Sequence, residues 1–211
     1  MDIIVCGTGE FAREIYHWII DAQKSMKIKF KGFLDSNNIS LAKFNLDHLY
    51  LGNEDDFRIT SNYSIIIAIA DKGVRENIFI KLNKRKVKFT NFIHPSVKLG
   101  GNLKFGTGNI ICPNCVFTCD INVGDFNIFN INTTVGHDVR IGGYNTFCSH
   151  TDITGNVKIE DGNFLGSRVS LLPNAKIGTN NKIAAGSVIY IGTRNNSLYM
   201  GNPAKKIGSN I

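Results

Sequence analysis

The sequence has no apolar run that approaches the roughly 18 residues a membrane-spanning helix needs. Its first ten residues, MDIIVCGTGE, lack the charged segment and the cleavage site of a secretory leader. The five cysteines are an odd number, and the pair Cys112-x2-Cys115 has no second pair at zinc-ligand spacing. We therefore expect a soluble, cytoplasmic protein with reduced thiols, no metal and no membrane partner.

The sequence also lacks the alternation of basic and aromatic residues with which proteins grip single-stranded nucleic acid. Its formal net charge is +7, but the lysines are scattered, and only the segment 81–88, KLNKRKVK, is dense. A solvated helix end explains that cluster, and a positive charge suits a phosphorylated small molecule as well as a nucleic acid. We expect no nucleic-acid partner.

Residues 1–93 alternate short apolar runs with helical patterns. We expect strands over 2–7, 27–35 and 63–70, and helices over 11–22 and 73–82. Uninterrupted β-branched runs separated by helices are typical of a small parallel sheet covered by helices. This region is therefore predicted to be a Rossmann-like α/β domain.

The first predicted strand is followed by the segment 7–12, Gly-Thr-Gly-Glu-Phe-Ala, which opens a helix. Glycines at such a turn let the backbone approach a phosphate at the helix N-terminus, and an acid after the second strand, here Asp35, takes a hydroxyl or a base edge. The domain lacks the second βαβ half that a dinucleotide requires, so a mononucleotide is favoured over NAD. Glu10 would bring negative charge beside any phosphate, and a purely structural tight turn is the alternative.

From residue 99 the apolar pattern changes to a period of six. Large apolar residues recur without an insertion or a polar substitution at Leu99, Phe105, Ile111, Phe117, Val123, Phe129, Val135, Ile141, Phe147, Ile153, Ile159, Leu165, Leu171, Ile177, Ile183 and Ile189. Small, β-branched or Asn residues lie two residues before them, such as Asn109, Thr133 and Ala175. Neither the helical period of 3.6 nor the strand period of 2 fits this pattern. A hexapeptide repeat does, and such repeats stack as β-helical coils.

Three hexads make one triangular coil of 18 residues, and the coils stack at about the 4.8 Å spacing of neighbouring strands. The repeat therefore predicts roughly five coils in a second domain over 94–211. The large residue of each hexad should fill the interior, and the small or Asn residue should fit beside it and bond along the stack. Because repeat proteins need capped ends, we expect the non-repetitive segment 193–211 to cap the last coil.

The two-domain order resembles that of a bacterial family of sugar O- and N-acyltransferases. That family is typified by the sialic acid O-acetyltransferases and by the nucleotide-sugar N-acetyltransferases that make bacillosamine, perosamine and related 4-amino sugars. The most specific elements are His94-Pro95, the segment NTTVGHDVRIG and the segment 201–204, Gly-Asn-Pro-Ala. The resemblance implies a left-handed parallel β-helix and a homotrimer with active sites between adjacent β-helices. It also implies acetyl-CoA as co-substrate and a nucleotide-linked sugar held by the N-terminal domain.

The resemblance also assigns residues. It implies that His137 is the catalytic base and that Asp138 raises its basicity. Nucleotide-sugar contacts fall on Gly7, Gly9, Glu10, Phe11, Asp35, Ser36 and Ala70. Coenzyme contacts fall on Thr146, Gly155, Ser167, Ala185 and Lys205. The chain departs from the family at Glu10, where a glycine is usual, at 70–72, and at Thr146, where some members have a second histidine whose contact His150 would have to supply.

Acetyl transfer needs a base that takes a proton from the attacking amine or hydroxyl, and neutral imidazole suits this at pH 7. A neighbouring carboxylate orients the ring and stabilises the imidazolium. One coil after His137 lies Gly155, whose N–H is a candidate donor to the oxyanion. The alternatives are that His137 is an exposed turn residue and that His150 is the base. Gly155, likewise, would be needed only because the corner requires a positive φ.

Three functions follow from these residues. We favour N-acetylation by acetyl-CoA of a 4-amino-4,6-dideoxy sugar linked to UDP or dTDP, for O-antigen or surface glycan synthesis, although the sequence leaves UDP, dTDP and GDP open. The alternative is O-acetylation of a sialic acid-type sugar. A scaffold or a carbonic anhydrase-like protein is the third, but three zinc-binding histidines would be needed and only His137 and His150 lie in the repeat.

Overall fold

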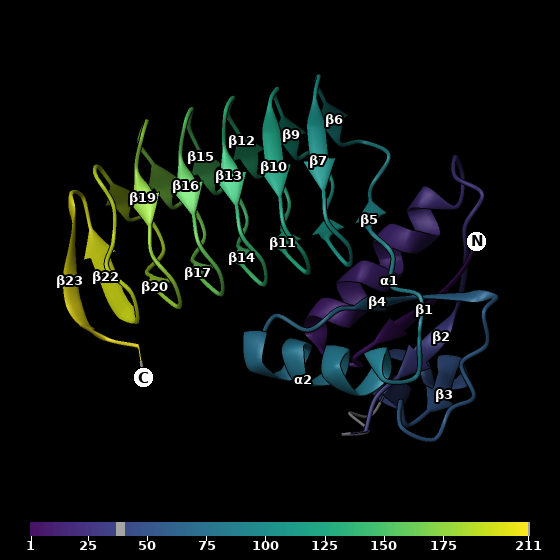
Figure 1. Cartoon of the computed structure of the whole chain (residues 1–211). Helices are drawn as coiled ribbons and strands as arrows, with labels where there is room; N and C mark the ends of the chain where they lie inside the picture. Colours follow the sequence, from purple (N-terminus) through teal and green to yellow (C-terminus); the bar gives the residue numbers. More distant parts are fainter. Residues whose placement is uncertain (37–40, 211) are drawn as a thin grey trace. The chain divides into compact units, whose positions relative to one another are not determined.

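The computed structural model describes residues 1–36 and 41–210 and divides the chain into two compact units, Met1–Pro95 and Ser96–Ile211 (Figure 1). The boundary falls two residues after the one predicted from the sequence. No helix among the described residues has the length and apolar character that crossing a membrane requires.

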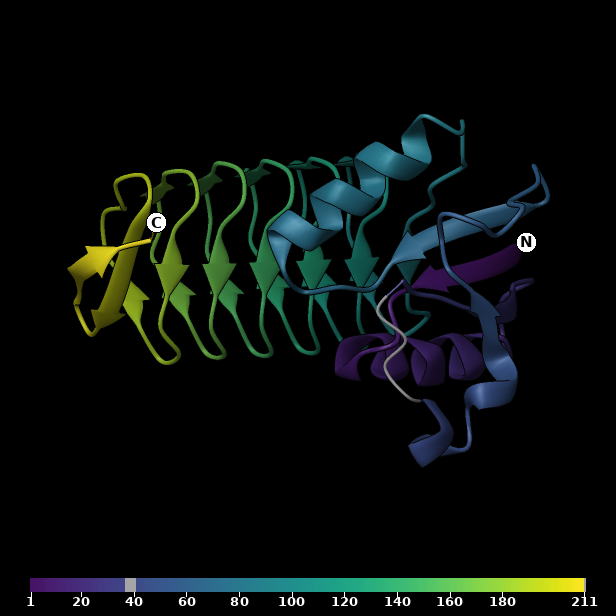
Figure 2. The same ribbon diagram turned by 90° about the horizontal axis from the view of Figure 1, so that it is seen from below.

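The first unit is built on a parallel sheet with the strand order β3-β2-β1-β4. The strands are β1 (Asp2–Cys6), β2 (Lys29–Leu34), β3 (Tyr50–Gly52) and β4 (Tyr63–Ile67). Their apolar runs are buried because helices α1 (Glu10–Ala22) and α2 (Lys72–Asn83) lie on opposite faces of the sheet (Figure 2). Strand β3 and the short 3-10 helices η1 (Leu41–Phe44) and η2 (Asp47–Leu49) were not predicted from the sequence.

Local sequence explains the two helices. Helix α1 buries Ala12, Ile15 and Ile19, three or four residues apart, so one apolar stripe faces the sheet. Helix α2 begins after Asp71, whose carboxylate accepts a hydrogen bond of 2.9 Å from the N–H of Val74 and so caps the first turn. Strand β5 (Phe92–Ile93) ends the unit.

The second unit is a parallel β-helix of short strands on three faces. One face contains β7 (Leu103–Phe105), β10 (Ile121–Val123), β13 (Arg140–Ile141), β16 (Lys158–Ile159) and β19 (Lys176–Ile177). The next contains β8 (Ile110–Ile111), β11 (Ile128–Phe129), β14 (Thr146–Phe147), β17 (Phe164–Leu165) and β20 (Lys182–Ile183). The third contains β6 (Lys98–Leu99), β9 (Val116–Phe117), β12 (Thr134–Val135), β15 (Asp152–Ile153), β18 (Ser170–Leu171) and β21 (Val188–Ile189).

Stacked residues lie one coil apart, as in the pairs Thr134 with Asp152 and Arg140 with Lys158. The large hexad residues from Ile111 to Ile189 are buried in the interior. Leu99 is an exception to the sequence prediction, because it lies in the first coil and its surface is 47% exposed. The interior residues of each coil are thus covered by the neighbouring coils, and the first coil has a neighbouring coil on one side only.

A ladder of asparagines runs through the interior beside these residues. Each side-chain carbonyl before the last accepts hydrogen bonds from the backbone N–H and the amide of the asparagine one coil further on, and that of Asn181 accepts from the Ser197 N–H. Its members are Asn109, Asn127, Asn145, Asn163 and Asn181. The predicted bonding along the stack is therefore present, and it satisfies polar groups that burial would otherwise leave without partners.

The chain turns each corner of the coil with a residue in the left-handed backbone region. These residues recur every six positions, and most are Asn, Asp or Gly, for which this conformation costs least. They include Asn114, Asp120, Asn132, Asp138, His150, Asn156 and Asn174.

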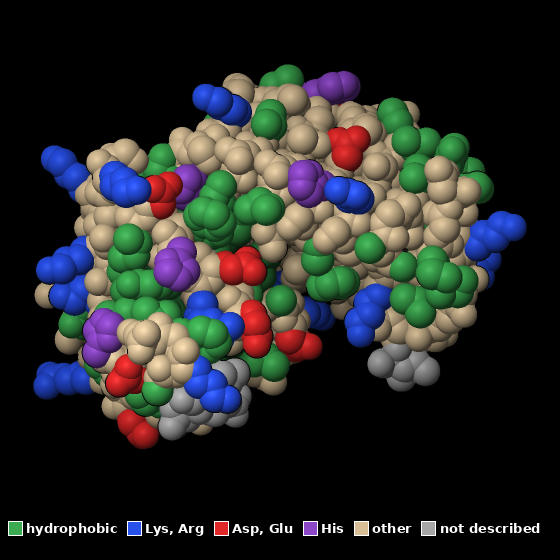
Figure 3. Space-filling view, turned by 180° about the vertical axis from the view of Figure 1, so that it is seen from behind, with side chains coloured by type: hydrophobic (Ala, Val, Ile, Leu, Met, Phe, Trp, Pro, Cys, Tyr) green, Lys and Arg blue, Asp and Glu red, His purple; other side chains and the backbone are tan. Residues whose placement is uncertain are grey.

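The last coil is followed by an antiparallel hairpin of β22 (Ser197–Gly201) and β23 (Ala204–Ser209). The segment 201–204 forms its turn, with a cis peptide bond before Pro203. Figure 3 shows hydrophobic side chains gathered over the last coil and this hairpin, where Tyr190, Ile191 and Met200 are exposed. The predicted non-repetitive cap is thus a hairpin that pairs with β20.

Candidate active site

His137 and Asp138 form a close pair at one corner of the β-helix. The distance between His137 Nδ1 and Asp138 Oδ2 is 2.8 Å. Neighbours on an extended strand would point apart, but Asp138 has φ 60°, which turns its side chain back toward the ring. Because a carboxylate only accepts hydrogen bonds, Nδ1 carries the hydrogen and the neutral ring presents an unprotonated Nε2.

Gly155 lies over the His137 ring. A Cβ built on Gly155 would be 2.6 Å from Nε2 of His137, which is too close for any side chain. Its φ is not in the left-handed region, so the need for glycine arises from the histidine and not from the turn. Within the described part of the chain, no residue accepts a hydrogen bond from the Gly155 N–H. An open donor thus lies next to the candidate base.

A cavity of about 540 Å³ surrounds this pair. It is lined by Asp120, His137, Asp138, Arg140, Gly155, Asn156, Lys158, Pro173 and Asn174. The His137 side chain is 64% exposed, so a ligand in the cavity can reach it. Hydrogen bonds from Asn102 and Cys119 lower the pKa of Asp120, which favours its ionised form. Arg140 and Lys158 add positive charge at the rim, which suits an anionic ligand.

His150 lies at another corner of the β-helix. Its Nε2 is 3.4 Å from Nδ2 of Asn132, which lies one coil earlier. His150 does not line the His137 cavity, and its φ of 61° corresponds to the hexad position of Asp138. Within one chain, His150 is therefore separated from Asp138, the carboxylate that pairs with His137.

The predicted coenzyme residues other than Gly155 do not line this cavity. Ser167 and Ala185 are exposed and lie one coil apart at a different corner, where Gly186 N–H donates to the Ser167 carbonyl at 2.9 Å. Thr146 is 5% exposed on β14. Lys205 is exposed on β23, opposite Met200. Within one chain, the candidate base therefore lies apart from these four positions.

The first unit contains a second cavity, of about 640 Å³, at the carboxyl ends of its strands. All seven predicted nucleotide-sugar residues line it, namely Gly7, Gly9, Glu10, Phe11, Asp35, Ser36 and Ala70. This edge of a parallel sheet is where ligands of such folds bind. The sequence pattern thus identified one continuous surface.

Asp35 holds the glycine turn in place. Its Oδ2 accepts hydrogen bonds from the N–H and the hydroxyl of Thr8, at 2.8 and 2.6 Å. A Cβ built on Gly7 would be 3.1 Å from the Ala68 carbonyl oxygen, and φ at Gly7 is 113°, so a side chain there would be crowded and strained. Asp35 is 9% exposed and faces the cavity, so it is both an anchor of the turn and a candidate ligand contact.

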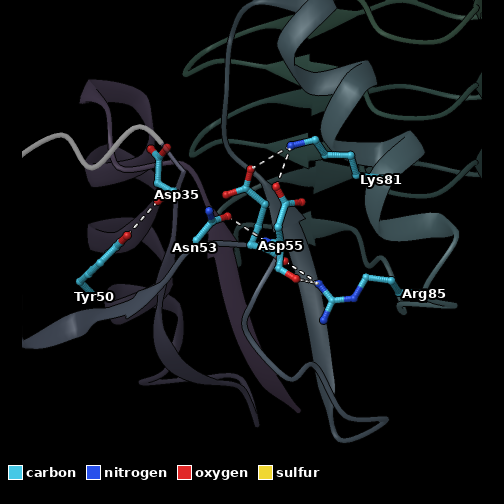
Figure 4. Close-up of polar contacts among 7 residues, drawn as sticks. Asp35, Tyr50, Asn53, Asp55, Lys81 and Arg85 are labelled. Atoms are coloured by element: carbon cyan, nitrogen blue, oxygen red, sulfur yellow. Dashed lines mark hydrogen bonds and ion pairs between the residues drawn. The ribbon is translucent and has the colours of Figure 1, made fainter.

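Two charged residues of this cavity were missed from the sequence. Glu54 follows the unpredicted strand β3, and Lys81 belongs to the basic segment that was interpreted as a solvated helix end. Lys81 Nζ donates to Asp55 at 3.0 Å and lies 3.9 Å from Glu54 Oε1 (Figure 4). A loop that contains four polar residues in succession, 53–56, has no periodicity that would have marked Glu54 as buried.

The cysteines do not form a metal site within the ranges that the structure describes, where no cluster of three or more possible ligands occurs. All five thiols are free. Cys112 and Cys115 are buried, and burial raises the pKa of Cys115 to about 12, which disfavours the thiolate that binds zinc.

Comparison with known families agrees with this architecture. Residues 2–82 match the family described as the PglD N-terminal domain, and residues 156–190 match the bacterial transferase hexapeptide repeat. The two matches place a PglD-type N-terminal domain ahead of a bacterial transferase hexapeptide repeat in this chain. Its fold is that of the sugar acetyltransferases of this type, in which the β-helix is left-handed. The predicted fold class and family resemblance are therefore confirmed.

Among solved structures, the chain is similar to WeeI from Acinetobacter baumannii, with 25% identity, a TM-score of 0.87, and 98% of this chain and 100% of that chain covered. It shares its fold with a variant of perosamine N-acetyltransferase from Caulobacter crescentus in complex with CoA and GDP-perosamine (22% identity, 0.87, 99% and 98% covered). The chain also shares its fold with the acetyltransferase domain of PglB from Neisseria gonorrhoeae in complex with acetyl coenzyme A, with 20% identity, a TM-score of 0.87, and 98% of each chain covered. No curated protein sequence matches the chain significantly.

Proposed function

We propose that this protein transfers the acetyl group of acetyl-CoA to the amino group of a nucleotide-linked sugar, with His137 as general base. The observation that carries the proposal is the His137–Asp138 pair, 2.8 Å apart, with the open N–H of Gly155 beside it. The proposed acceptor is a 4-amino-4,6-dideoxy sugar for surface glycan or O-antigen synthesis. The perosamine enzyme of the same fold, solved with CoA and GDP-perosamine, supports an amino sugar.

The residues at the corner suit each step of acetyl transfer. The amine attacks the thioester carbonyl while Nε2 of His137 takes its proton, and Asp138 stabilises the imidazolium that forms. The carbonyl oxygen, on which negative charge develops, accepts a hydrogen bond from the Gly155 N–H, a donor worth about 2.7–4 kcal/mol to the transition state in comparable sites. When the carbon–sulfur bond breaks, the proton on His137 passes to the CoA thiolate. No acyl-enzyme is required.

The cavity of the first unit supports a nucleotide-linked acceptor over a free sugar. It contains a glycine turn at the start of α1 and a carboxylate after β2, which is the layout of a nucleotide site. The same base would also serve a sugar hydroxyl, so O-acetylation of a sialic acid-type sugar is the alternative. Because acetyl-CoA and nucleotide sugars are cytoplasmic metabolites, we propose that the reaction takes place in the cytoplasm.

We also propose that the protein acts as a homotrimer. His137 and Gly155 lie at one corner of the β-helix, and the coenzyme positions Ser167 and Ala185 lie at another. A coenzyme that contacts both sets would therefore lie between two copies of the chain.

The test is an assay of thiol release from acetyl-CoA with UDP-, dTDP- and GDP-linked 4-amino sugars and with free sialic acid. We expect release with a nucleotide-linked amino sugar, and a loss of at least about 1,000-fold in kcat for His137→Ala, because a base and its coupled partner are removed together. His48→Ala replaces an exposed histidine of the first unit and serves as the control. Acetylation of sialic acid alone, or full turnover by His137→Ala, would contradict the proposal.

A further inference from the structure

Glu54 is a buried carboxylate at the wall of the cavity in the first unit. The residue is 2% exposed, and no residue in the ranges 1–36 and 41–210 donates a hydrogen bond to its Oε2. Its other oxygen, Oε1, is 3.9 Å from Lys81 Nζ, beyond hydrogen-bond distance. The lysine donates instead to Asp55, at 3.0 Å. Glu54 therefore lines the cavity with a long ion pair to Lys81 and with no hydrogen bond from the described residues to its Oε2.

The loop that carries Glu54 is fixed by its backbone. Arg85 Nη1 donates to the Glu54 carbonyl at 2.5 Å, and its Nη2 donates to the Phe57 carbonyl at 2.5 Å. Figure 4 shows Arg85, two residues after the end of α2, reaching this loop close to Asp55. These bonds fix the backbone from which the carboxylate projects. A buried carboxylate without donors is costly, so a ligand that supplies donors at this position gains more than it would at the surface.

The charge of the cavity limits which part of a nucleotide sugar Glu54 meets. The lining contains three carboxylates, Glu10, Asp35 and Glu54, against the single cation Lys81. A diphosphate beside Glu54 would be repelled. The apolar wall formed by Val74 and Ile78 of α2, together with Ala68 and Ile69, suits a flat base. The base is therefore the part that Glu54 is placed to contact.

Resting on the proposed function, we infer that Glu54 selects a guanine nucleotide sugar by accepting hydrogen bonds from N1–H and the 2-amino group of guanine. Guanine has these two donors side by side, whereas uracil and thymine have one N–H between two carbonyl oxygens that a carboxylate repels. Cytosine and adenine have a ring acceptor next to their amino group. A carboxylate is an acceptor only, so two adjacent donors match it best. This favours GDP over the UDP or dTDP preferred from the sequence.

The test is calorimetric binding of GDP, IDP, UDP and dTDP to the full-length protein. We expect GDP to bind about 10- to 100-fold more tightly than UDP or dTDP, a ratio typical of one bidentate contact to a base. IDP, which lacks the 2-amino group, should lose most of that advantage. Because this series uses the unaltered protein, it does not depend on a variant that folds.

The variant Glu54→Gln converts one acceptor into a donor. It should weaken GDP binding about tenfold or more and prefer XDP, whose C2 carbonyl accepts from the new amide. The matched control is Asp56→Asn, at an exposed carboxylate of the same loop, which does not line the cavity and should leave the order of affinities unchanged. Equal or tighter binding of UDP or dTDP, or Glu54→Gln with wild-type preference, would overturn the inference. Acetyl transfer to a dTDP-linked sugar would then still satisfy the proposed function, so the two fail separately.

Discussion

The space over the His137 ring admits a glycine and nothing larger. A Cβ on Gly155 would be 2.6 Å from Nε2 and 2.7 Å from Cε1 of His137. The ring also bonds to Asp138 at 2.8 Å, so a shift of the ring displaces this contact or moves Asp138 with it. Position 155 therefore controls the room above the candidate base and holds the proposed oxyanion donor.

Gly155→Ala is expected to reduce kcat by at least about 100-fold while the β-helix stays folded, because the added methyl displaces the ring and covers the N–H. Steady-state release of CoA measures the loss, and circular dichroism with a thermal melt measures the fold. Gly101→Ala is the control, since a Cβ on Gly101 meets no atom within 4 Å. An active Gly155→Ala enzyme would show that neither the room nor the donor matters.

At the scale of the element, the asparagine ladder ties each coil to the next. Asn145 accepts from the backbone N–H of Asn163 at 2.8 Å and from its amide at 3.0 Å, and donates to Asn127. The Asn163 amide has a second acceptor in the Glu160 carbonyl, at 3.0 Å. Loss of Asn145 therefore leaves mainly the buried Asn163 N–H without a partner.

Asn145→Ala should lower the free energy of unfolding by about 1–3 kcal/mol, the cost of a buried group left unsatisfied. Urea denaturation followed by circular dichroism gives this value. Asn114→Gly removes an asparagine at an exposed corner with φ 60°, a conformation that glycine adopts without strain. It should lower the free energy of unfolding far less. If the two variants were equally stable, the ladder would contribute nothing beyond its neighbours.

The hexad pattern predicted the coils because every sixth residue has to fill the same interior, and this repeats at each coil. It predicted the Gly155 position for the same reason, as one coil after His137. It did not predict how Asp138 reaches its partner, because a left-handed corner at that residue is a backbone property that apolar spacing does not encode. Glu54 was missed since its burial depends on α2 and Arg85, which are distant in sequence.

At the scale of the molecule, the two candidate sites belong to separate units of the chain, and the β-helix separates base from coenzyme positions. Light scattering after size exclusion should give a mass of about three times 23.3 kDa. A trimer is expected because Ser167 and His137 occupy different corners and one chain alone does not bring them together. A monomer with full acetyltransferase activity would contradict this arrangement.

The regular coil of the β-helix also restricts which insertions and deletions the repeat can accept. Deleting six residues between Leu99 and His137 would keep every interior position apolar, yet it would move the candidate catalytic corner by a third of a turn relative to the coils before it. Only insertions or deletions of 18 residues preserve the orientation of the site relative to the coils before it. Length variation among natural homologues of this domain should therefore come in whole coils, with other insertions confined to loops that leave the corner untouched.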